Sequence, residues 1–163
     1  MENKNIRERE EIHKAIWSIA DDLRGSVDGW DFKQYILGIM FYRYISENMT
    51  NYINEGERKA GDNNFDYAKL SDEEAETIRK EMVNEKGFFI LPSELFANVC
   101  KKAKDDENLN ETLERIFNNI ENSAKGAESE EDFAGLFDDI DVNSNKLGAT
   151  VAKRNDKLVK ILD

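Results

Sequence analysis

The stretch that decides the fold is Leu23–Ser46, which reads LRGSVDGWDFKQYILGIMFYRYIS. Between Tyr35 and Ile45, apolar side chains occur on almost every side of a predicted helix, interrupted only by Gly38 and Arg43. A helix that is apolar all round is typical of the interior of a protein. We therefore expect this helix to lie at the centre of the fold.

Further helical patterns surround this central helix. Apolar residues recur at helical spacing in several segments. Ser71 and Glu74 have the spacing of a capping box, and Gly25 and Gly87 follow predicted helix ends. The expected helices are 6–24, 29–54 (the central one), 71–84, 93–103, 109–120, a short turn at 133–140, and a last helix that carries Val151, Leu158 and Leu162, with a loop over 55–66.

One short segment interrupts the helices. It reads FFILP and ends at Pro92, whose ring disfavours helix in the residue before it. No regular strand alternation or hairpin turn occurs between apolar runs. The sequence therefore predicts an all-α fold, a compact multi-helix bundle with a central, nearly all-apolar helix and one short extended segment before Pro92. We expect a single helical domain over residues 1–163.

The formal charge of −12 is unevenly spread. Residues 1–59 carry −2, and residues 60–163 carry −10. Because affinity for duplex DNA rests on Lys and Arg at the phosphates, we expect any nucleic-acid contact in the N-terminal third. The acidic run over 128–141, with seven carboxylates and no Lys or Arg, is interpreted as a solvated surface rather than a site for a basic partner.

Cysteine content and hydropathy indicate the compartment. Cys100 is the only cysteine, so an internal disulfide is excluded and a reducing compartment is favoured. No apolar run approaches the ~18 residues of a membrane span. The N-terminus, MENKNIRERE, has no apolar signal core. We therefore predict a cytoplasmic protein with no membrane partner.

Residues for catalysis or metal binding are scarce. With one histidine, His13, and one cysteine, the chain cannot build a His/Cys zinc cluster. No phosphate-binding or dinucleotide-binding glycine motif occurs. The run that begins at Asp139 starts like a calcium-binding loop, but Ser144 and Thr150 stand where glycine and glutamate are needed. We predict no catalytic, cofactor-binding or metal-binding residue.

Three basic residues are the candidate contacts: Arg24, Lys33 and Arg43. Lys33 and Arg43 lie among aromatic residues on which bases could stack. The interpretation that the sequence favours is that the aromatics are core and that Arg43 pairs with Glu47 one turn on. Arg24 ends a helix beside a glycine turn, where it could either complement the helix dipole or reach a phosphate. For Arg24 the two alternatives stay open.

Three blocks carry a family resemblance: Ile16–Gly25 (IWSIADDLRG), Asp31–Gly38 (DFKQYILG) and Phe41–Ser46 (FYRYIS). They resemble the N-terminal helical domain of the modification subunit of type I restriction-modification systems. The weaker blocks FILP, ending at Pro92, and NSNKLG, over 143–148, follow in the expected order. The resemblance covers essentially the whole chain.

The resemblance implies a function in DNA methylation. In this family the complete subunit transfers a methyl group from S-adenosylmethionine to N6 of adenine. It works with a second modification subunit, a specificity subunit and a restriction subunit on double-stranded DNA. The family's Asn-Pro-Pro-aromatic motif cannot occur in a chain with one proline, and the cofactor-binding glycine motif is absent. The implied piece is thus a non-catalytic domain that helps the complex assemble and close around DNA, with S-adenosylmethionine expected only in a catalytic domain absent from this chain.

A second hypothesis rests on the net negative charge of the chain alone. A small acidic helical adaptor, or a DNA mimic, would bind a basic partner and reject DNA. A mimic should align its carboxylates along one face, so the arrangement of these side chains discriminates between the two hypotheses.

Overall fold

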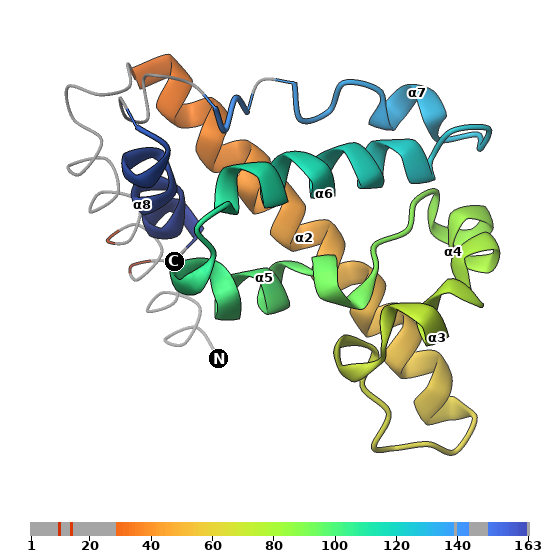
Figure 1. Ribbon diagram of the computed structural model, residues 1–163. Coiled ribbons are helices and arrows are strands. Elements are labelled where there is room, and N and C mark those ends of the chain that lie inside the picture. Colours follow the sequence, from red (N-terminus) through yellow and green to blue (C-terminus); the bar gives the residue numbers. More distant parts are fainter. Residues whose placement is uncertain (1–9, 11–13, 15–28, 139, 144–149, 163) are drawn as a thin grey trace.

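The computed structural model describes residues 10, 14, 29–138, 140–143 and 150–162 (Figure 1). These residues contain helices and turns but no strand, which confirms the all-α prediction. Apart from Glu10 and Lys14, which are helical, the helix expected at 6–24 lies outside the described residues.

The longest helix, α2 (Gly29–Lys59), crosses the molecule and is packed by α5 (Phe96–Lys102), α8 (Val151–Leu162) and the 3₁₀ turn η1 (Tyr67–Lys69) (Figure 1). Its central position confirms the sequence prediction. One side of the helix is buried at helical spacing, through Tyr35, Ile39, Tyr42, Ile45, Met49 and Ile53.

Although α2 is central, one of its sides is exposed. Leu37, Met40 and Tyr44 are 61%, 51% and 64% exposed. The reason is that the described elements which pack on α2 cover the side that carries Tyr35 and Tyr42. The apolar character of the other side therefore needs an explanation other than the core of the described chain.

Gly38 interrupts the apolar run because Ile140 packs against it. A Cβ atom placed on Gly38 would lie 1.8 Å from Cδ1 of Ile140 and 2.5 Å from its Cγ1. Ile140 itself is buried. The missing side chain thus lets the segment after α7 (Glu130–Phe133) approach the backbone of α2 closely.

An aromatic cluster joins α2 to the rest of the core. The ring of Tyr42 meets Phe96 edge-on at 5.5 Å and Phe117 at 5.6 Å between centroids. Phe117 stacks on Phe137 at 4.4 Å. Such pairs favour a fixed ring geometry beyond the simple burial of apolar area.

The end of α2 differs from the prediction, which placed a loop from Glu55. The helix continues to Lys59, through Gly56, because a single exposed glycine costs a helix only about 1 kcal/mol. Arg58 and Lys59 in its last turn suit the negative end of the helix dipole. The chain then folds back, and the Tyr67 amide donates to Oδ1 of Asn54 at 2.8 Å.

The single helix predicted over 71–84 is divided into α3 (Asp72–Glu76) and α4 (Arg79–Lys86). The predicted Ser71–Glu74 capping box is confirmed. The helix breaks because its hydrogen bonding changes after Ala75: the Ile78 amide donates to the Ala75 carbonyl three residues back, as in a 3₁₀ turn, instead of four residues back. Gly87 ends α4 in the left-handed conformation, as expected, with φ of 89°.

The extended segment Phe88–Leu91 is confirmed and crosses the interior, with Phe88, Phe89 and Ile90 all buried. Side chains from distant elements hold its backbone. The Phe89 amide donates to Ser123 Oγ at 2.9 Å, and the Tyr67 hydroxyl donates to the Ile90 carbonyl at 2.7 Å. These bonds satisfy polar groups that a buried chain cannot leave unpaired.

The helix predicted to start at Ser93 starts three residues later. Pro92–Glu94 forms a 3₁₀ turn, η2, and Leu95 is extended before α5 begins at Phe96. Asp72 fixes the turn by accepting from the Ser93 amide at 3.0 Å and from its hydroxyl at 2.6 Å. A second turn, η3 (Ala103–Asp105), follows α5.

The C-terminal part is formed by α6 (Leu109–Ser123), α7 and α8, with α8 packed on α6. All predicted core positions of α6 are buried: Leu109, Leu113, Ile116, Phe117 and Ile120. The helical turn expected at 133–140 lies earlier, in α7 (Glu130–Phe133). Gly135 has a left-handed backbone conformation, with φ of 69°, so a right-handed helix does not continue through it.

In α8 the stripe predicted from Val151 is only partly correct. Leu158 and Leu162 are buried, whereas Val151 is 46% exposed. The buried side instead includes Asn155, whose Oδ1 accepts from the Asn110 amide of α6 at 3.0 Å. A polar residue thus takes a buried position in α8, where it forms hydrogen bonds with Asn110 and with the Glu107 carbonyl.

Candidate functional site

The α2 outer face, formed by Leu37, Met40, Arg43 and Tyr44, is the first candidate site. Residues three, four and seven positions apart lie on one side of a helix, so Leu37, Met40 and Tyr44 form one exposed stripe. Large exposed apolar side chains gathered on one surface are typical of interaction sites. Arg43 borders this stripe.

Arg43 is held in place from two directions. Its Nε donates to Oε1 of Glu47 at 2.8 Å, which confirms the predicted pairing one turn on. Its guanidinium also lies 5.8 Å from the centre of the Phe96 ring. Both charged side chains are more than half exposed, so this ion pair stabilises the helix only weakly. The positive charge of Arg43 thus lies at the surface and is partly neutralised by the carboxylate of Glu47.

The other two candidate basic residues are not placed beside Arg43. Arg24 lies outside the described residues, and Lys33 belongs to α2, one turn before Leu37, with its side chain outside the described part. The roles proposed for these two residues stay predictions.

The aromatics of α2 divide between core and surface. Tyr35 and Tyr42 are buried, and their hydroxyls donate to the carbonyls of Asp141 and Glu94. This agrees with the core interpretation that the sequence favoured. Tyr44 and Tyr52, in contrast, are exposed, and Tyr44 lies on the α2 outer face.

A second site, the Glu94 cleft, was missed by the sequence analysis. It is a cleft of about 210 Å³ lined by Arg79, Phe89, Leu91, Glu94, Asn119, Asn122 and Ser123. Glu94 is only 6% exposed, and its Oε1 accepts from Asn119 Nδ2 at 2.8 Å. The one signal in the sequence is an acidic residue inside the apolar run FFILPSELF.

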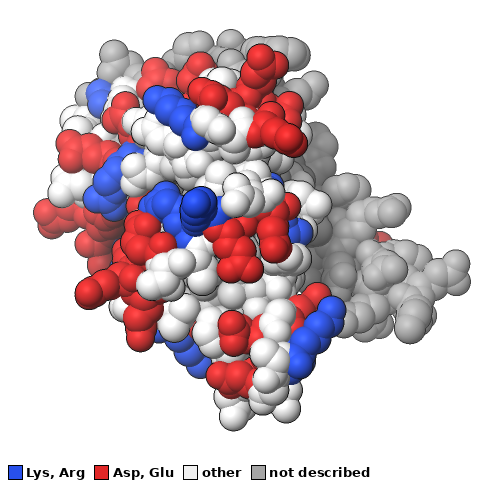
Figure 2. Space-filling model, turned by 90° about the vertical axis from the view of Figure 1, so that its right-hand side faces the viewer, with Lys and Arg blue, Asp and Glu red and all other residues white. Residues whose placement is uncertain are grey.

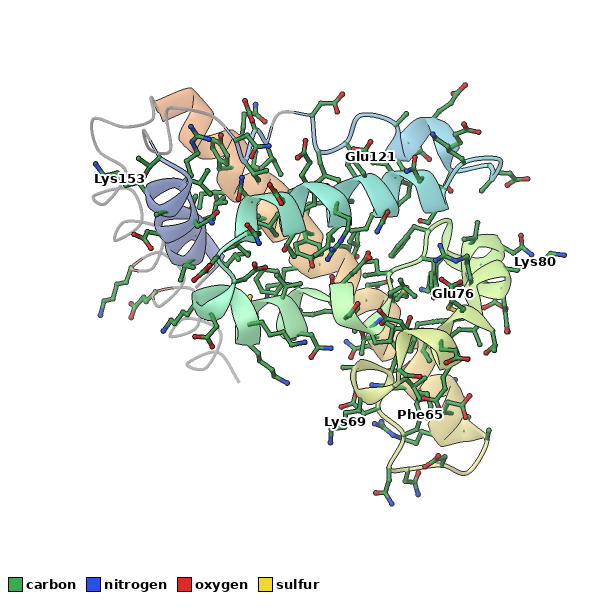
Figure 3. All side chains as sticks on the ribbon, in the orientation of Figure 1. Phe65, Lys69, Glu76, Lys80, Glu121 and Lys153 are labelled. Carbon is green, nitrogen blue, oxygen red and sulfur yellow. The ribbon has the colours of Figure 1, made fainter. Side chains whose placement is uncertain are left out.

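The surroundings of Glu94 act on the pKa of its carboxyl in opposite directions. Burial is the main cause that raises the pKa of the Glu94 carboxyl, while the Asn119 hydrogen bond and the positive charge of Arg115 lower it. Arg79 is engaged elsewhere, with Nε and Nη2 bonded to Glu76 at 2.7 and 2.6 Å. In Figure 3, Glu76 lies on the inner side of α3 and α4, whereas Lys80 points away from the molecule.

Neither a metal site nor an acidic stripe is visible in the described part of the chain. No group of three or more His, Cys, Asp or Glu side chains there could hold a metal ion. The carboxylates of the 128–141 run that the structure describes are exposed where their side chains are placed. Figure 2 shows acidic and basic side chains interspersed over one face rather than aligned. This arrangement does not favour the DNA-mimic hypothesis.

Among the described helices, none combines the length and the apolar character that crossing a bilayer requires.

The fold and the α2 outer face together define an all-helical domain with one exposed apolar helix face. The family model described as the HsdM N-terminal domain matches residues 12–163, and the chain belongs to this family. This confirms the resemblance to the N-terminal domain of type I modification subunits.

Two relatives extend the comparison. The chain is 44% identical over 169 residues to the type I restriction enzyme MpnII methylase subunit of Mycoplasma pneumoniae, covering 99% of this chain and 31% of that protein. It is also similar to the crystal structure of the type I restriction-modification methyltransferase subunit from Streptococcus thermophilus, with 28% identity and a TM-score of 0.69, over 94% of this chain and 32% of that one. The chain thus spans about a third of the length of these relatives.

Proposed function

We propose that this N-terminal domain has no catalytic role and helps a type I modification complex to assemble and to close around double-stranded DNA. The partners are a specificity subunit, a second modification subunit and a restriction subunit, in the cytoplasm. Adenine N6-methylation, with S-adenosylmethionine as donor, belongs to a catalytic domain outside this chain. The relatives are methylase or methyltransferase subunits about three times as long, which supports this division.

The α2 outer face is the observation that carries the proposal. Leu37, Met40 and Tyr44 are each at least half exposed, although an apolar helix gains stability by burying such side chains. Aromatic residues, Met and Arg are also the residue types enriched in protein interfaces. We therefore assign this face to contact with another subunit of the complex.

The contribution of this domain to DNA binding is electrostatic and small. The net charge of −12 opposes binding to phosphates, and Arg43 is partly compensated by Glu47. We expect the isolated chain to bind duplex DNA weakly and to lose that binding with added salt. Tight binding at about 0.5 M salt would contradict this picture, because phosphate contacts weaken steeply with ionic strength.

The experiment that tests the assembly role uses the complete modification–specificity complex. The triple variant Leu37→Ser, Met40→Ser, Tyr44→Ser should weaken subunit association or retention of DNA by about tenfold or more, because exposed apolar anchors dominate interface energies. Mass photometry and gel retardation measure the two effects. Binding of S-adenosylmethionine should stay unchanged.

A matched control replaces Asn48 and Asn51, which are exposed and polar on the same helix, by serine. This control should leave association and DNA retention as in the unmodified complex. Equal behaviour of the triple variant and the unmodified complex in both assays would overturn the proposal.

A further inference from the structure

The Glu94 cleft presents a carboxylate whose hydrogen bonding is incomplete. Asn119 occupies Oε1, while Oε2 makes no hydrogen bond or ion pair to any described residue. Yet Glu94 is more than nine-tenths buried. Oε2 is not one of the fully buried unpaired atoms of the described chain, so it is accessible from the cleft that Glu94 lines. A carboxylate in a mostly buried side chain is stabilised by a cation or by further donors, so this accessible oxygen is suited to an incoming positive group.

The two arginines whose positive charge acts on the Glu94 carboxyl, Arg79 and Arg115, make no hydrogen bond or ion pair with it among the described residues. Arg79 lies 4.5 Å from the centre of the Phe89 ring and is paired with Glu76 through two hydrogen bonds. Arg115 is exposed and, within the described chain, forms no ion pair. Arg79 therefore lines the cleft with its charge already paired, and Arg115 does not line the cleft.

The polar lining of the cleft favours a planar group with many donors. The Asn119 amide is oriented by its bond to Glu94, which leaves its carbonyl oxygen as an acceptor. The Asn122 side chain, also in the lining, makes no hydrogen bond within the described chain. A guanidinium has five N–H donors in one plane, whereas an ammonium has three around a point charge. About 210 Å³ is room for several waters at ~30 Å³ each, and so for such a group.

From this geometry we propose that the Glu94 cleft binds a guanidinium group, namely an arginine side chain of a partner protein. The guanidinium donates to Oε2 of Glu94 and to the side-chain carbonyls of Asn119 and Asn122. The site lies between α4, Phe89 and α6 and is distinct from the α2 outer face. The inference does not depend on the assembly role proposed for that face.

The test is a titration of the isotope-labelled chain, followed by NMR, with the blocked tripeptide acetyl-Gly-Arg-Gly-amide at about 0.15 M salt, where surface charges are screened. We expect saturable shifts of Glu94, Asn119 and Asn122. The corresponding lysine tripeptide should bind about fivefold or more weakly, since it lacks the planar donor set. Bound arginine peptide should also lower the pKa of Glu94, because a nearby cation favours the carboxylate.

Two variants separate the cleft from general attraction to an acidic chain. Glu94→Gln should weaken binding about tenfold, while Glu128→Gln, which removes the same charge from an exposed loop position, should leave binding unchanged. The amide spectrum checks that each variant is folded, and the pKa shift of Glu94 gives an answer in the unmodified chain if Glu94→Gln fails to fold. Equal binding of the two tripeptides, equal binding by both variants, or tighter binding of free arginine than of the tripeptide would each contradict the proposal.

Discussion

Helices α6 and α2 both contribute to the core, but they distribute their apolar residues differently. In α6 the buried residues follow one stripe, and the opposite side is polar. In α2 the buried stripe is matched by Leu37, Met40 and Tyr44 on the exposed side. Burial in the described chain therefore accounts for the apolar residues of α6, but not for Leu37, Met40 and Tyr44 of α2.

The largest effect is expected in α6. Leu113 is fully buried, so Leu113→Ala should lower the free energy of unfolding by about 2–5 kcal/mol through lost burial and a cavity. Urea denaturation measures this change. A loss below about 1 kcal/mol would mean that Leu113 is not packed in the core, contrary to its burial in α6.

The contact between Gly38 and Ile140 gives the next effect. Gly38→Ala should destabilise by about 1–3 kcal/mol, because the new methyl group forces Ile140 to move. The matched control is Gly56→Ala in the same helix, where nothing lies within 4 Å and where alanine should stabilise by up to about 1 kcal/mol. Thermal or urea unfolding of both variants compares them directly. Stabilisation by both substitutions would show that Ile140 can move away without cost.

A smaller effect is expected at Tyr42, whose buried hydroxyl donates to the carbonyl of Glu94. Tyr42→Phe leaves that carbonyl unpaired and should cost about 1–2 kcal/mol. Tyr44→Phe, on the exposed side, should change the stability hardly at all. Equal losses for the two tyrosines would argue against the division of α2 into two sides.

The smallest effect should come from the α2 outer face itself. Met40→Ala should change the free energy of unfolding by no more than about 0.5 kcal/mol, since the side chain is 51% exposed. The neighbouring residue Ile39 is only 5% exposed, so Ile39→Ala should lower the free energy of unfolding by about 2–5 kcal/mol. A large loss at Met40 would mean that this side is packed in the isolated chain.

Local chemistry made much of this fold predictable. The period of α6, the Ser71–Glu74 capping box, the glycine that ends α4 and the proline after Phe88–Leu91 each act over a few residues. All four are visible in the sequence. The same holds for the Arg43–Glu47 pair, which needs only helical spacing.

The remaining features depend on distant contacts. Asp72 fixes the turn that delays α5, and Asn155 takes a buried position in α8 because the Asn110 amide lies opposite. The Glu94 cleft combines α4, the extended segment Phe88–Leu91, η2 and α6, which only the tertiary fold brings together. Within residues 35–45 apolar content alone does not reveal which side of α2 is exposed, because Leu37, Met40 and Tyr44 are as apolar as the buried residues.

The position of α2 near the start of the chain has a consequence for biosynthesis. The Tyr42 hydroxyl bonds to a carbonyl 52 residues further on, and the Tyr35 hydroxyl to one 106 residues further on. At about 5–20 residues per second, translation takes roughly 5–20 s to supply the second partner. During that time the most apolar helix leaves the ribosome with its buried side uncovered. A nascent chain of this sequence should therefore be a client of ribosome-associated chaperones until the residues around Ile140 have emerged.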